Sequence, residues 1–432
     1  MLESATENAY YPQLAVTANG EAIAGWFSGE PPGLVGGGTA QADRARTAAS
    51  IGGPVVVDRG SVTGGFEAPV VLSSHGSADV RVAVSGSGVA YAVWSEVPGE
   101  AVMVATASPG QPFSAPHPLL PPNTKLLGLV QSTDGPVAAA WVTSNPSSLT
   151  SRVLHYALLD ANGDLGRTVT VGPMRLVGPG VSVALNDHGT FAAVGVTQFP
   201  VAVPLAGAQP SRPVVAVCDA AGQCSQQVLM LGRVPVTDDM QDAVALSDDG
   251  TVAVLAAYGG ALVKPGQSRS LGLWAEVRRP NGHWLRAQEV SRTAATNPLL
   301  ATADGRHEDL TVFTNEANGM ETGLEWSRLP TSETRFAKAH VVGGPRASTE
   351  PTVAADGAGN FVIAWRSDTT IPQVAVATGE GDRVAGVRLI APDSQIPFEV
   401  DTGIDGGGDA LVIWSGWREN RPQGVFAAFY RP

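Results

Sequence analysis

The feature that most constrains this chain is a repeat of two short apolar runs joined by a glycine turn. The segment VAVSGSGVAYAVW (82–94) is one copy, and its turn glycine precedes a tryptophan by six residues. Five copies keep both residues, in the pairs Gly20–Trp26, Gly88–Trp94, Gly135–Trp141, Gly359–Trp365 and Gly408–Trp414. Three weaker copies keep the glycine alone, at Gly189, Gly250 and Gly305. A repeat of this kind constrains the architecture more strongly than any single residue does.

The repeat length predicts the fold class. Successive turn glycines are 47 to 68 residues apart, a range that includes the length of a four-stranded propeller blade. Each unit continues with two further apolar runs, and no segment shows a sustained helical period. We therefore predict an all-β chain, an eight-bladed β-propeller of four-stranded antiparallel blades that forms one domain over residues 1–432. Seven blades is the alternative if the long first unit is not a full blade.

The two ends of the chain predict how the ring closes. The last unit stops after its third run, QGVFAAFYRP, whereas the first unit is preceded by a spare segment, ESATENAYYPQ. We expect this N-terminal segment to supply the missing fourth strand of the last blade. Such an exchange would remove two open sheet edges.

The residues within each copy suit a blade. The first run of each copy is rich in small residues, as strands crowded around a ring axis require. Asp-Gly and Asn-Gly pairs supply tight hairpin turns. Five tryptophans at one position could form a row that stacks on carbohydrate, but we favour packing between neighbouring blades, because a repeated core position explains them without a ligand.

Composition restricts the partners. The net charge is −13 without any offsetting Lys/Arg cluster, which argues against sequence-independent binding to nucleic acid or anionic lipid. No run of 18 apolar residues is present, so no membrane span is expected.

The two cysteines predict a disulfide. Cys218 and Cys224 flank a hairpin turn in VCDAAGQC, and facing positions across a hairpin lie close to disulfide distance. A disulfide favours an oxidising compartment. The segment MLESATENAYY lacks the regions of a signal peptide. Either the protein is cytoplasmic or the chain begins after a removed signal, and we expect a secreted or cell-surface protein.

The pattern resembles that of secreted bacterial β-propellers and is similar to sialidase-like blades. In those blades the turn between the third and fourth strands carries an Asp-box that ends in an aromatic residue. The aromatic is present here at Phe66, Phe113, Trp284 and Phe336, without the Ser and Asp of the box. The resemblance covers the whole chain as a repeat class and implies a propeller fold.

Loop lengths predict where a site lies. In a meandering blade, the turns between strands one and two and between three and four point to one face, here the short-turn face. The other connections point to the opposite face, here the long-loop face, and binding residues sit preferentially on such loops. The candidates there, of which Trp417 is the most suggestive because it breaks the repeat, are Trp417, Arg418, Arg421, Arg366, Asp368 and Tyr258. A solvated loop residue is the alternative for each.

Chemistry beyond binding has weaker signals. The sequence contains no G-x-S-x-G, H-E-x-x-H or C-x-x-C motif, so we lean against catalysis and expect no cofactor. Calcium is a possibility in TDDMQD, through Asp238, Asp239 and Asp242, although the alternating spacing of a known calcium loop is missing.

Three functions fit these observations. The first is a secreted binding module that recognises a glycan or a protein with its long-loop face. The second is a hydrolase or lyase acting on polysaccharide, with acids and arginines gathered at the ring axis. The third is a structural subunit of an extracellular assembly. Fold alone does not choose among them, because propellers host all three.

Overall fold

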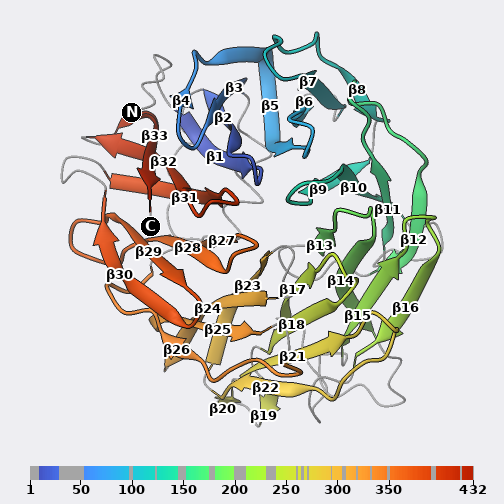
Figure 1. Cartoon of the computed structure of the whole chain (residues 1–432), viewed down its shortest axis with the longest axis vertical. Coiled ribbons are helices and arrows are strands. Elements are labelled where there is room, and N and C mark those ends of the chain that lie inside the picture. The colour runs from blue at the N-terminus through green and yellow to red at the C-terminus, as the bar shows by residue number, and fades with distance from the viewer. Residues whose placement is uncertain are drawn as a thin grey trace.

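The chain forms a ring of radially arranged antiparallel sheets, seen in a computed structural model of all 432 residues (Figure 1). Every element in the described part of the chain is a strand. The structure describes residues 9–28, 53–96, 101–121, 124–144, 152–174, 181–198, 211–229, 240–258, 261–263, 267–269, 272–292, 294–303, 308–317, 320–330, 333–347, 351–390, 396–418 and 421–431. Within these ranges no helix is long and apolar enough to span a membrane.

Eight blades confirm the predicted fold and exclude the seven-bladed alternative. The first two blades contain β1 (Ala9–Val16), β2 (Glu21–Ser28), β3 (Gly53–Ser61), β4 (Gly65–Phe66), β5 (Val70–Val84), β6 (Ala90–Glu96), β7 (Val102–Ala107) and β8 (His117–Leu120). The third and fourth contain β9 (Lys125–Gln131), β10 (Val137–Ser144), β11 (Arg152–Leu158), β12 (Val169–Met174), β13 (Ser182–Leu185), β14 (Phe191–Gln198), β15 (Ser211–Cys218) and β16 (Cys224–Val228).

The second half of the ring repeats the same meander. The fifth and sixth blades contain β17 (Met240–Leu246), β18 (Val252–Tyr258), β21 (Leu273–Arg278), β22 (Gln288–Ser291), β23 (Ala294–Ala303), β24 (Glu308–Ala317), β25 (Met320–Leu329) and β26 (His340–Val341). The last two contain β27 (Thr352–Ala355), β28 (Asn360–Arg366), β29 (Val374–Glu380), β30 (Arg383–Leu389), β31 (Ile396–Ile404), β32 (Ala410–Arg418) and β33 (Arg421–Tyr430). A small extra hairpin, β19 (Ala261–Val263) with β20 (Gln267–Arg269), lies in the connection between β18 and β21.

One long strand joins the first two blades. The beginning of β5 pairs with β3 at the outside of the first blade, and its end pairs with β6 at the inside of the second. The register shifts between Ala78 and Arg81, within the part of β5 that pairs with β6. As a result these two blades form one continuous sheet of eight strands.

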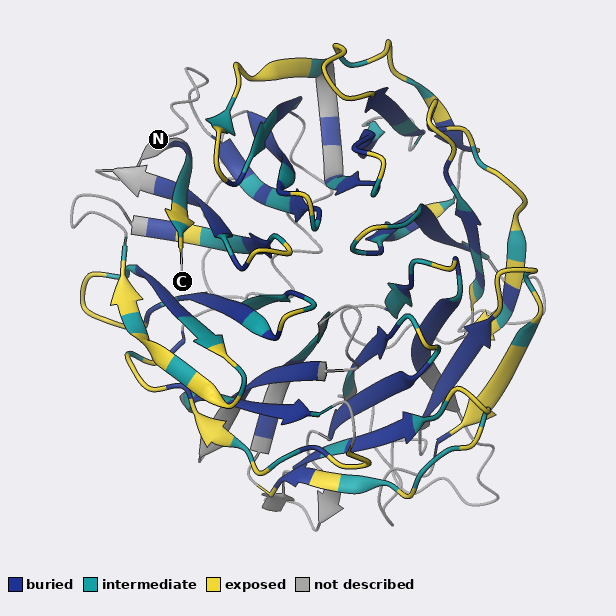
Figure 2. Cartoon of the chain, in the orientation of Figure 1, coloured by how far each residue is buried: buried dark blue, intermediate teal, exposed yellow. Residues whose placement is uncertain are grey.

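The cores lie between the blades, and the recurrent tryptophans are part of them. Trp26 packs with Leu411 and Ile413 of the last blade, whereas Trp94 packs with valines of the first. Buried residues accordingly fill the middle strands of the blades in Figure 2, and exposed residues gather on the outer ones. This confirms that the tryptophans pack between blades, and it removes them as a carbohydrate-stacking row.

The short turns explain the recurrent glycines. Six of them, at positions 20, 88, 189, 250, 359 and 408, have φ between 76° and 90°, where an L side chain is strained. Gly135 differs, because its φ is not positive. There a Cβ atom would lie 2.6 Å from the Cα atom of Asp187 in the neighbouring turn, so close approach of two turns requires the glycine.

The ring closes through contacts between the last and first blades. The Oδ2 atom of Asp401 accepts a hydrogen bond from the backbone N–H of Leu14 at 2.8 Å, and the Gly406 N–H donates to the Ala18 carbonyl at 2.8 Å. The described last blade has three strands, β31, β32 and β33. The N-terminal segment was expected to supply a fourth, but its residues 9–13 belong to β1, where Ala9, Tyr10 and Gln13 pair with β2. The rest of that expectation falls on residues 1–8, which lie outside the described residues.

The cysteine prediction is confirmed. Cys218 ends β15, Cys224 begins β16, and the two residues are paired across the hairpin and bonded as a disulfide. Cys218 is fully buried in the core between the third and fourth blades. The bond therefore links the outermost strand of the fourth blade, β16, to β15, whose last residue is buried in that core.

Candidate functional site

A polar cluster lies where the innermost strands of three consecutive blades meet. Gln13 of β1, Arg81 of β5 and Asp401 of β31 each stand seven residues before the turn glycine of their blade. The same position in the third and fifth blades carries Gly128 and Ala243, which offer no polar side chain. We call Gln13, Arg81 and Asp401 the axial cluster.

Hydrogen bonds and charge connect the members of the axial cluster. The Nη1 atom of Arg81 donates to the Oε1 atom of Gln13 at 3.0 Å. Burial raises the pKa of Asp401 to about 6, an effect that is opposed by N–H donors from Leu14 and Thr402 and by the charge of Arg81. A guanidinium and a carboxyl group thus share one site, and Arg81 keeps further N–H groups beyond the one bonded to Gln13.

Backbone irregularities sit beside the axial cluster. In β1, Tyr11 and Pro12 together oppose Trp26, and Tyr11 has a φ of 53°. In β31, Phe398 and Glu399 form a corresponding two-residue bulge between Pro397 and Val400. A positive φ at an aromatic residue is strained, and bulges re-aim side chains next to functional sites.

Each of these two bulges contains an aromatic residue. Phe398 is 39% exposed although it lies on an innermost strand, and Tyr11 is half-buried. Both precede the axial cluster along their strands, which run towards the short turns. They therefore lie on the long-loop side of Gln13 and Asp401, at the end of the ring where the sequence predicts the site.

A cavity of about 180 Å³ occupies another part of the ring axis. Its lining comes from the inner strands of the third to sixth blades, β9, β13, β17 and β23, and from the beginning of the β9–β10 turn. The cavity lining and the axial cluster have no residue in common. The axis thus has a charged sector at the last, first and second blades and, at the third to sixth, a cavity lined by uncharged residues.

Two of the six predicted ligand-binding residues are described with their side chains. Arg366 ends β28 and is half-buried; burial lowers the pKa of its guanidinium, and the charge of Asp368 opposes this effect. Asp368 is exposed, and its backbone N–H donates to the Arg346 carbonyl at 2.7 Å. The structure therefore brings Arg366 and Asp368 within electrostatic range of each other, and their role in binding stays a prediction.

The other candidates are only partly described. The backbones of Trp417 and Arg418 belong to β32, that of Arg421 to β33 and that of Tyr258 to β18, but their side chains lie outside the described residues. Asp238 and Asp239 also fall outside them. Asp242 lies on β17, and burial raises its pKa to about 8. Among the described residues no three His, Cys, Asp or Glu side chains are placed to hold a metal, and the calcium site stays a prediction.

The sequence interpretation missed the axial cluster for an identifiable reason. It assumed that small residues fill every innermost strand, and it searched the loops for charge. The signal was present in the alignment of the repeats, because only some units place a charged or amide side chain seven residues before the glycine. The bulges that expose Phe398 leave no comparable mark in the sequence.

Comparison with known proteins finds similar solved structures but no match by sequence. No protein-family model and no curated protein matches the sequence. The structure is similar to the polysaccharide lyase Uly1, at 10% identity over 90% of each chain with a TM-score of 0.49. It is also similar to the β-propeller domain of the Trilobed protease from Pyrococcus furiosus, at 11% identity over 82% of this chain and 94% of that one, with a TM-score of 0.46.

A neuraminidase-like protein is also among the structural neighbours. A neuraminidase-like protein from A/bat/Guatemala matches at 7% identity over 86% of this chain and 83% of that one, with a TM-score of 0.42. Polysaccharide lyases and neuraminidase-like proteins are thus among the structural neighbours.

Proposed function

We propose that this chain is a secreted binding module that recognises a glycan or a protein at the long-loop end of its ring axis. The observation that carries the proposal is the axial cluster, in which Arg81 is held by Gln13, together with the exposed aromatic side chain of Phe398, three residues before Asp401 on β31. A fixed guanidinium offers several donors to hydroxyl, carbonyl or carboxylate oxygens. An exposed phenyl ring offers a flat apolar surface to a sugar face or an apolar side chain.

The use of the carboxyl groups favours binding over catalysis. Both carboxyl oxygens of Asp401 accept backbone N–H groups, Oδ2 from Leu14 and Oδ1 from Thr402. A carboxyl group engaged in this way holds two blades together. Glycoside hydrolysis needs a second carboxyl group placed opposite the first. The axial cluster contains a single carboxyl group, that of Asp401.

An enzyme acting on polysaccharide is the second candidate. It is favoured by the pKa of Asp401, which burial raises to about 6, close to the range in which a carboxyl group exchanges protons near neutral pH. Arg81 beside it would stabilise a developing negative charge. In this candidate Asp401 is the acid or base and Arg81 the electrostatic partner.

A structural subunit is the third candidate. The exposed apolar side chains of Val71, Val341, Leu389 and Phe429 lie on the outer strands of the first, sixth, seventh and eighth blades. A partner that packs against the rim of the ring would cover them.

One screen distinguishes the candidates. Labelled bacterial and plant glycans are offered to the purified chain, and both retention and release of fragments are measured. Retention without release, lost in Arg81→Ala and kept in Arg383→Ala on the exposed outer strand β30, supports the binding module. Release of fragments that Asp401→Asn abolishes supports the enzyme. If no glycan is retained or released, the ligand is a protein or the chain is structural.

A further inference from the structure

Gln131 of the third blade joins the inner strands of the first two blades. It is the last residue of β9 and stands four residues before the turn glycine Gly135. Its Nε2 atom donates to the Val16 carbonyl of β1 at 2.9 Å, and its Oε1 atom accepts from the Val84 N–H of β5 at 3.0 Å. One side chain thus holds strands of two other blades.

The two partners of Gln131 require an amide. A backbone N–H bonds only to an acceptor and a carbonyl only to a donor, so a carboxylate could not serve Val16 and an ammonium group could not serve Val84. The same position in the other seven units is occupied by Val, Leu, Ala or Ile. Packing at this position is therefore satisfied by apolar residues, and the amide of Gln131 is explained by its two hydrogen bonds.

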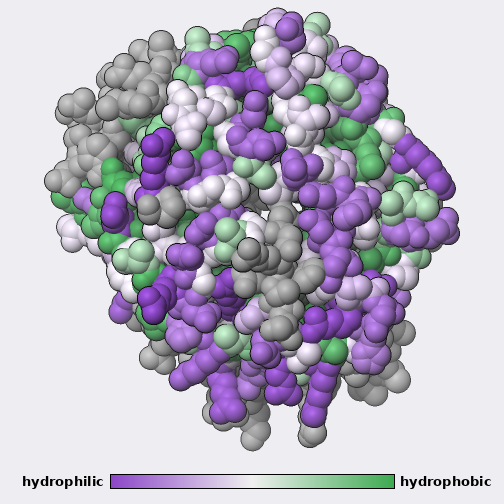
Figure 3. Space-filling model, viewed as in Figure 1, coloured by the Kyte–Doolittle hydropathy of each residue, from purple (hydrophilic) through white to green (hydrophobic). Residues whose placement is uncertain are grey.

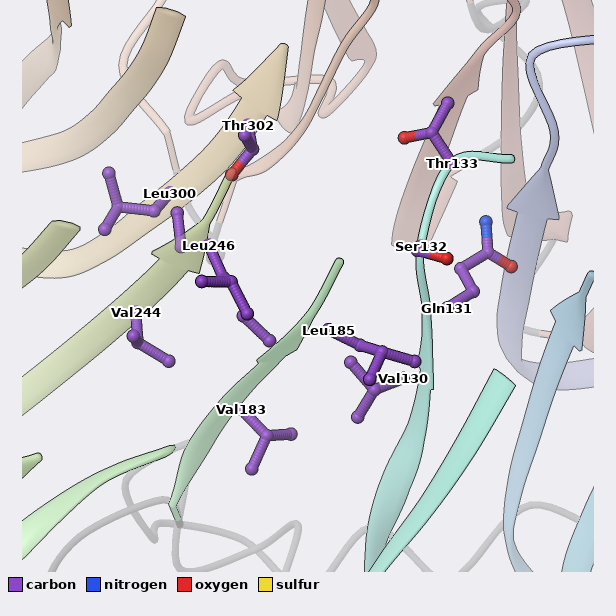
Figure 4. Close-up of a pocket in the computed structure, with 12 residues that line it drawn as sticks. Val130, Gln131, Ser132, Thr133, Val183, Leu185, Val244, Leu246, Leu300 and Thr302 are labelled. Carbon is purple, nitrogen blue, oxygen red and sulfur yellow. The ribbon is translucent and has the colours of Figure 1, made fainter. Parts of the chain in front are cut away.

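The direction of the Gln131 side chain is visible in Figure 4. Gln131 is one of the residues around the cavity of about 180 Å³, but its amide is turned away from Leu246 and Thr302 across the hollow, towards the blue strands of the first two blades. The described surface around the ring centre is mostly hydrophilic in Figure 3, yet this amide is engaged by backbone groups. Gln131 therefore belongs to the wall between the hollow and the first two blades.

The strands that Gln131 joins carry two members of the axial cluster. Gln13 stands three residues before Val16 on β1, and Arg81 stands three residues before Val84 on β5. The Gln131 bridge and the Arg81–Gln13 hydrogen bond thus connect the same two strands at corresponding positions, about 10 Å apart along the strands.

Backbone pairing does not fix the spacing of these two strands. The order of strands in their sheet is β1, β2, β3, β5, so in the described structure β1 and β5 share no ladder of backbone hydrogen bonds. Side chains must therefore set the distance between them at the axis. The Nη1–Oε1 distance between Arg81 and Gln13 is 3.0 Å, and a separation of the strands by about 1 Å would break this hydrogen bond.

We propose that Gln131 is a positioning residue for the axial cluster, which fixes the spacing of β1 and β5 and so holds Arg81 in place to meet a ligand. This inference rests on the proposed binding function. It extends the site to the third blade, which contributes no member of the axial cluster. Gln131 acts through Arg81 and Gln13 rather than by contact with the ligand.

The titration of Asp401 reports the position of Arg81 without any ligand. Burial raises the pKa of Asp401 to about 6, and the charge of Arg81 opposes this effect. Gln131→Met keeps the length of the side chain and removes both hydrogen bonds. Arg81 should then lie farther from Asp401 on average, and the pKa of Asp401 should rise by at least about 0.5, an about three-fold change in its acid constant. NMR of the labelled carboxyl carbon of Asp401 in the full chain, assigned with Asp401→Asn, measures this pKa.

Two further variants show whether Gln131 acts through Arg81. Leu185→Met changes the same position in the fourth blade and should leave the pKa of Asp401 unchanged. Arg81→Gln removes the charge and should raise this pKa, and adding Gln131→Met to it should produce no further rise. If Gln131→Met does not fold, Gln131→Leu introduces the residue that the fourth and fifth blades carry at this position and makes the same comparison.

The outcomes of this titration decide the inference. It is supported if the pKa of Asp401 rises in Gln131→Met alone and not further in the double variant. It is overturned if the pKa does not rise in Gln131→Met, rises equally in Leu185→Met, or rises again in the double variant. Because no ligand enters the titration, a failure of the glycan screen and a failure of this inference are separate results.

Discussion

Asp401 in the last blade accepts a hydrogen bond from the backbone N–H of Leu14 in the first, at 2.8 Å between Oδ2 and N. The two residues are 387 positions apart, and this bond spans the seam of the ring. The fourth blade uses the same arrangement, since the Ser182 hydroxyl accepts the N–H of Val244 in the fifth at 3.0 Å. A side chain seven residues before the turn glycine thus holds the edge of the next inner strand.

Removing Asp401 should loosen the seam. Asp401→Ala leaves the N–H groups of Leu14 and Thr402 without their acceptor, so the free energy of unfolding should fall by about 1–3 kcal/mol. Ser182→Ala is the matched control, because it removes one neutral hydrogen bond at the same position and should cost about 0.5–1.5 kcal/mol. Chemical denaturation of both variants measures the difference. Equal losses would mean that the seam is no more sensitive than any other contact between blades.

Buried carboxyl groups should make the protein more stable in acid than at neutral pH. Burial raises the pKa of Asp58 and of Asp309 to about 7, and both residues are 1% exposed. The folded state therefore binds protons that an unfolded aspartate, with a pKa near 3.9, has already released. The contribution of these groups to stability is fully present below about pH 4 and is lost as the pH rises to about 7.

The variant Asp58→Asn tests this pH dependence. The amide cannot ionise, so the free energy of unfolding should fall less between about pH 5 and about pH 8 than it does in the unmodified chain. Asp382→Asn, on an exposed residue beside β30, serves as the control. Denaturation across this pH range measures the effect. A parallel pair of pH profiles for Asp58→Asn and the unmodified chain would contradict the assignment.

Replacing a turn glycine with a residue that has a side chain should lower the free energy of unfolding. Gly88 has a φ of 78°, and a Cβ atom there would lie 2.9 Å from Cγ of Pro109. Gly88→Val should therefore lower the free energy of unfolding by about 1–3 kcal/mol. Gly128→Ala is the control, since a Cβ atom at that position would meet no heavy atom beyond its chain neighbours within 4 Å, and its φ is not positive. An unchanged melting temperature for Gly88→Val would refute the strain.

The disulfide should protect both cysteines from thiol reagents. The non-reduced chain should weigh less than the reduced chain by two hydrogen atoms, because Cys218 and Cys224 are bonded. The bond closes a loop with a sequence separation of 6, so its removal in the double serine variant should cost about 2 kcal/mol on loop-entropy grounds. Mass spectrometry and denaturation check the two statements. Complete labelling of the native, non-reduced chain would show that the bond is absent in solution.

The repeat predicted the architecture because its conserved positions are the ones that turns and packing between blades require. Each glycine marks a turn that repeats around the ring, and each tryptophan marks a contact between blades, as Gly88 and Trp94 show. The Cys218–Cys224 bond was predictable for a similar reason, since it depends on two positions in one hairpin.

The axial site was not predictable in the same way. Gln13, Arg81 and Asp401 lie in three different units, and only closure of the ring brings them together. The bulge at Phe398 depends on how β31 pairs with β32, which no local pattern reveals. The N-terminal exchange was expected from the missing last strand together with the spare N-terminal segment, yet residues 9–13 belong to β1 of the first blade.

Because of the shared strand β5, the connections between neighbouring blades are not equally strong around the ring. In the described structure the other boundaries between neighbouring blades rely on side-chain packing and a few hydrogen bonds, whereas the first and second blades share strand β5 and form one hydrogen-bonded sheet. If the ring is strained by heat or by force, the first two blades should stay together while other boundaries give way. We expect the ring to open at the seam between Asp401 and Leu14, with the joined first and second blades on one side of the gap.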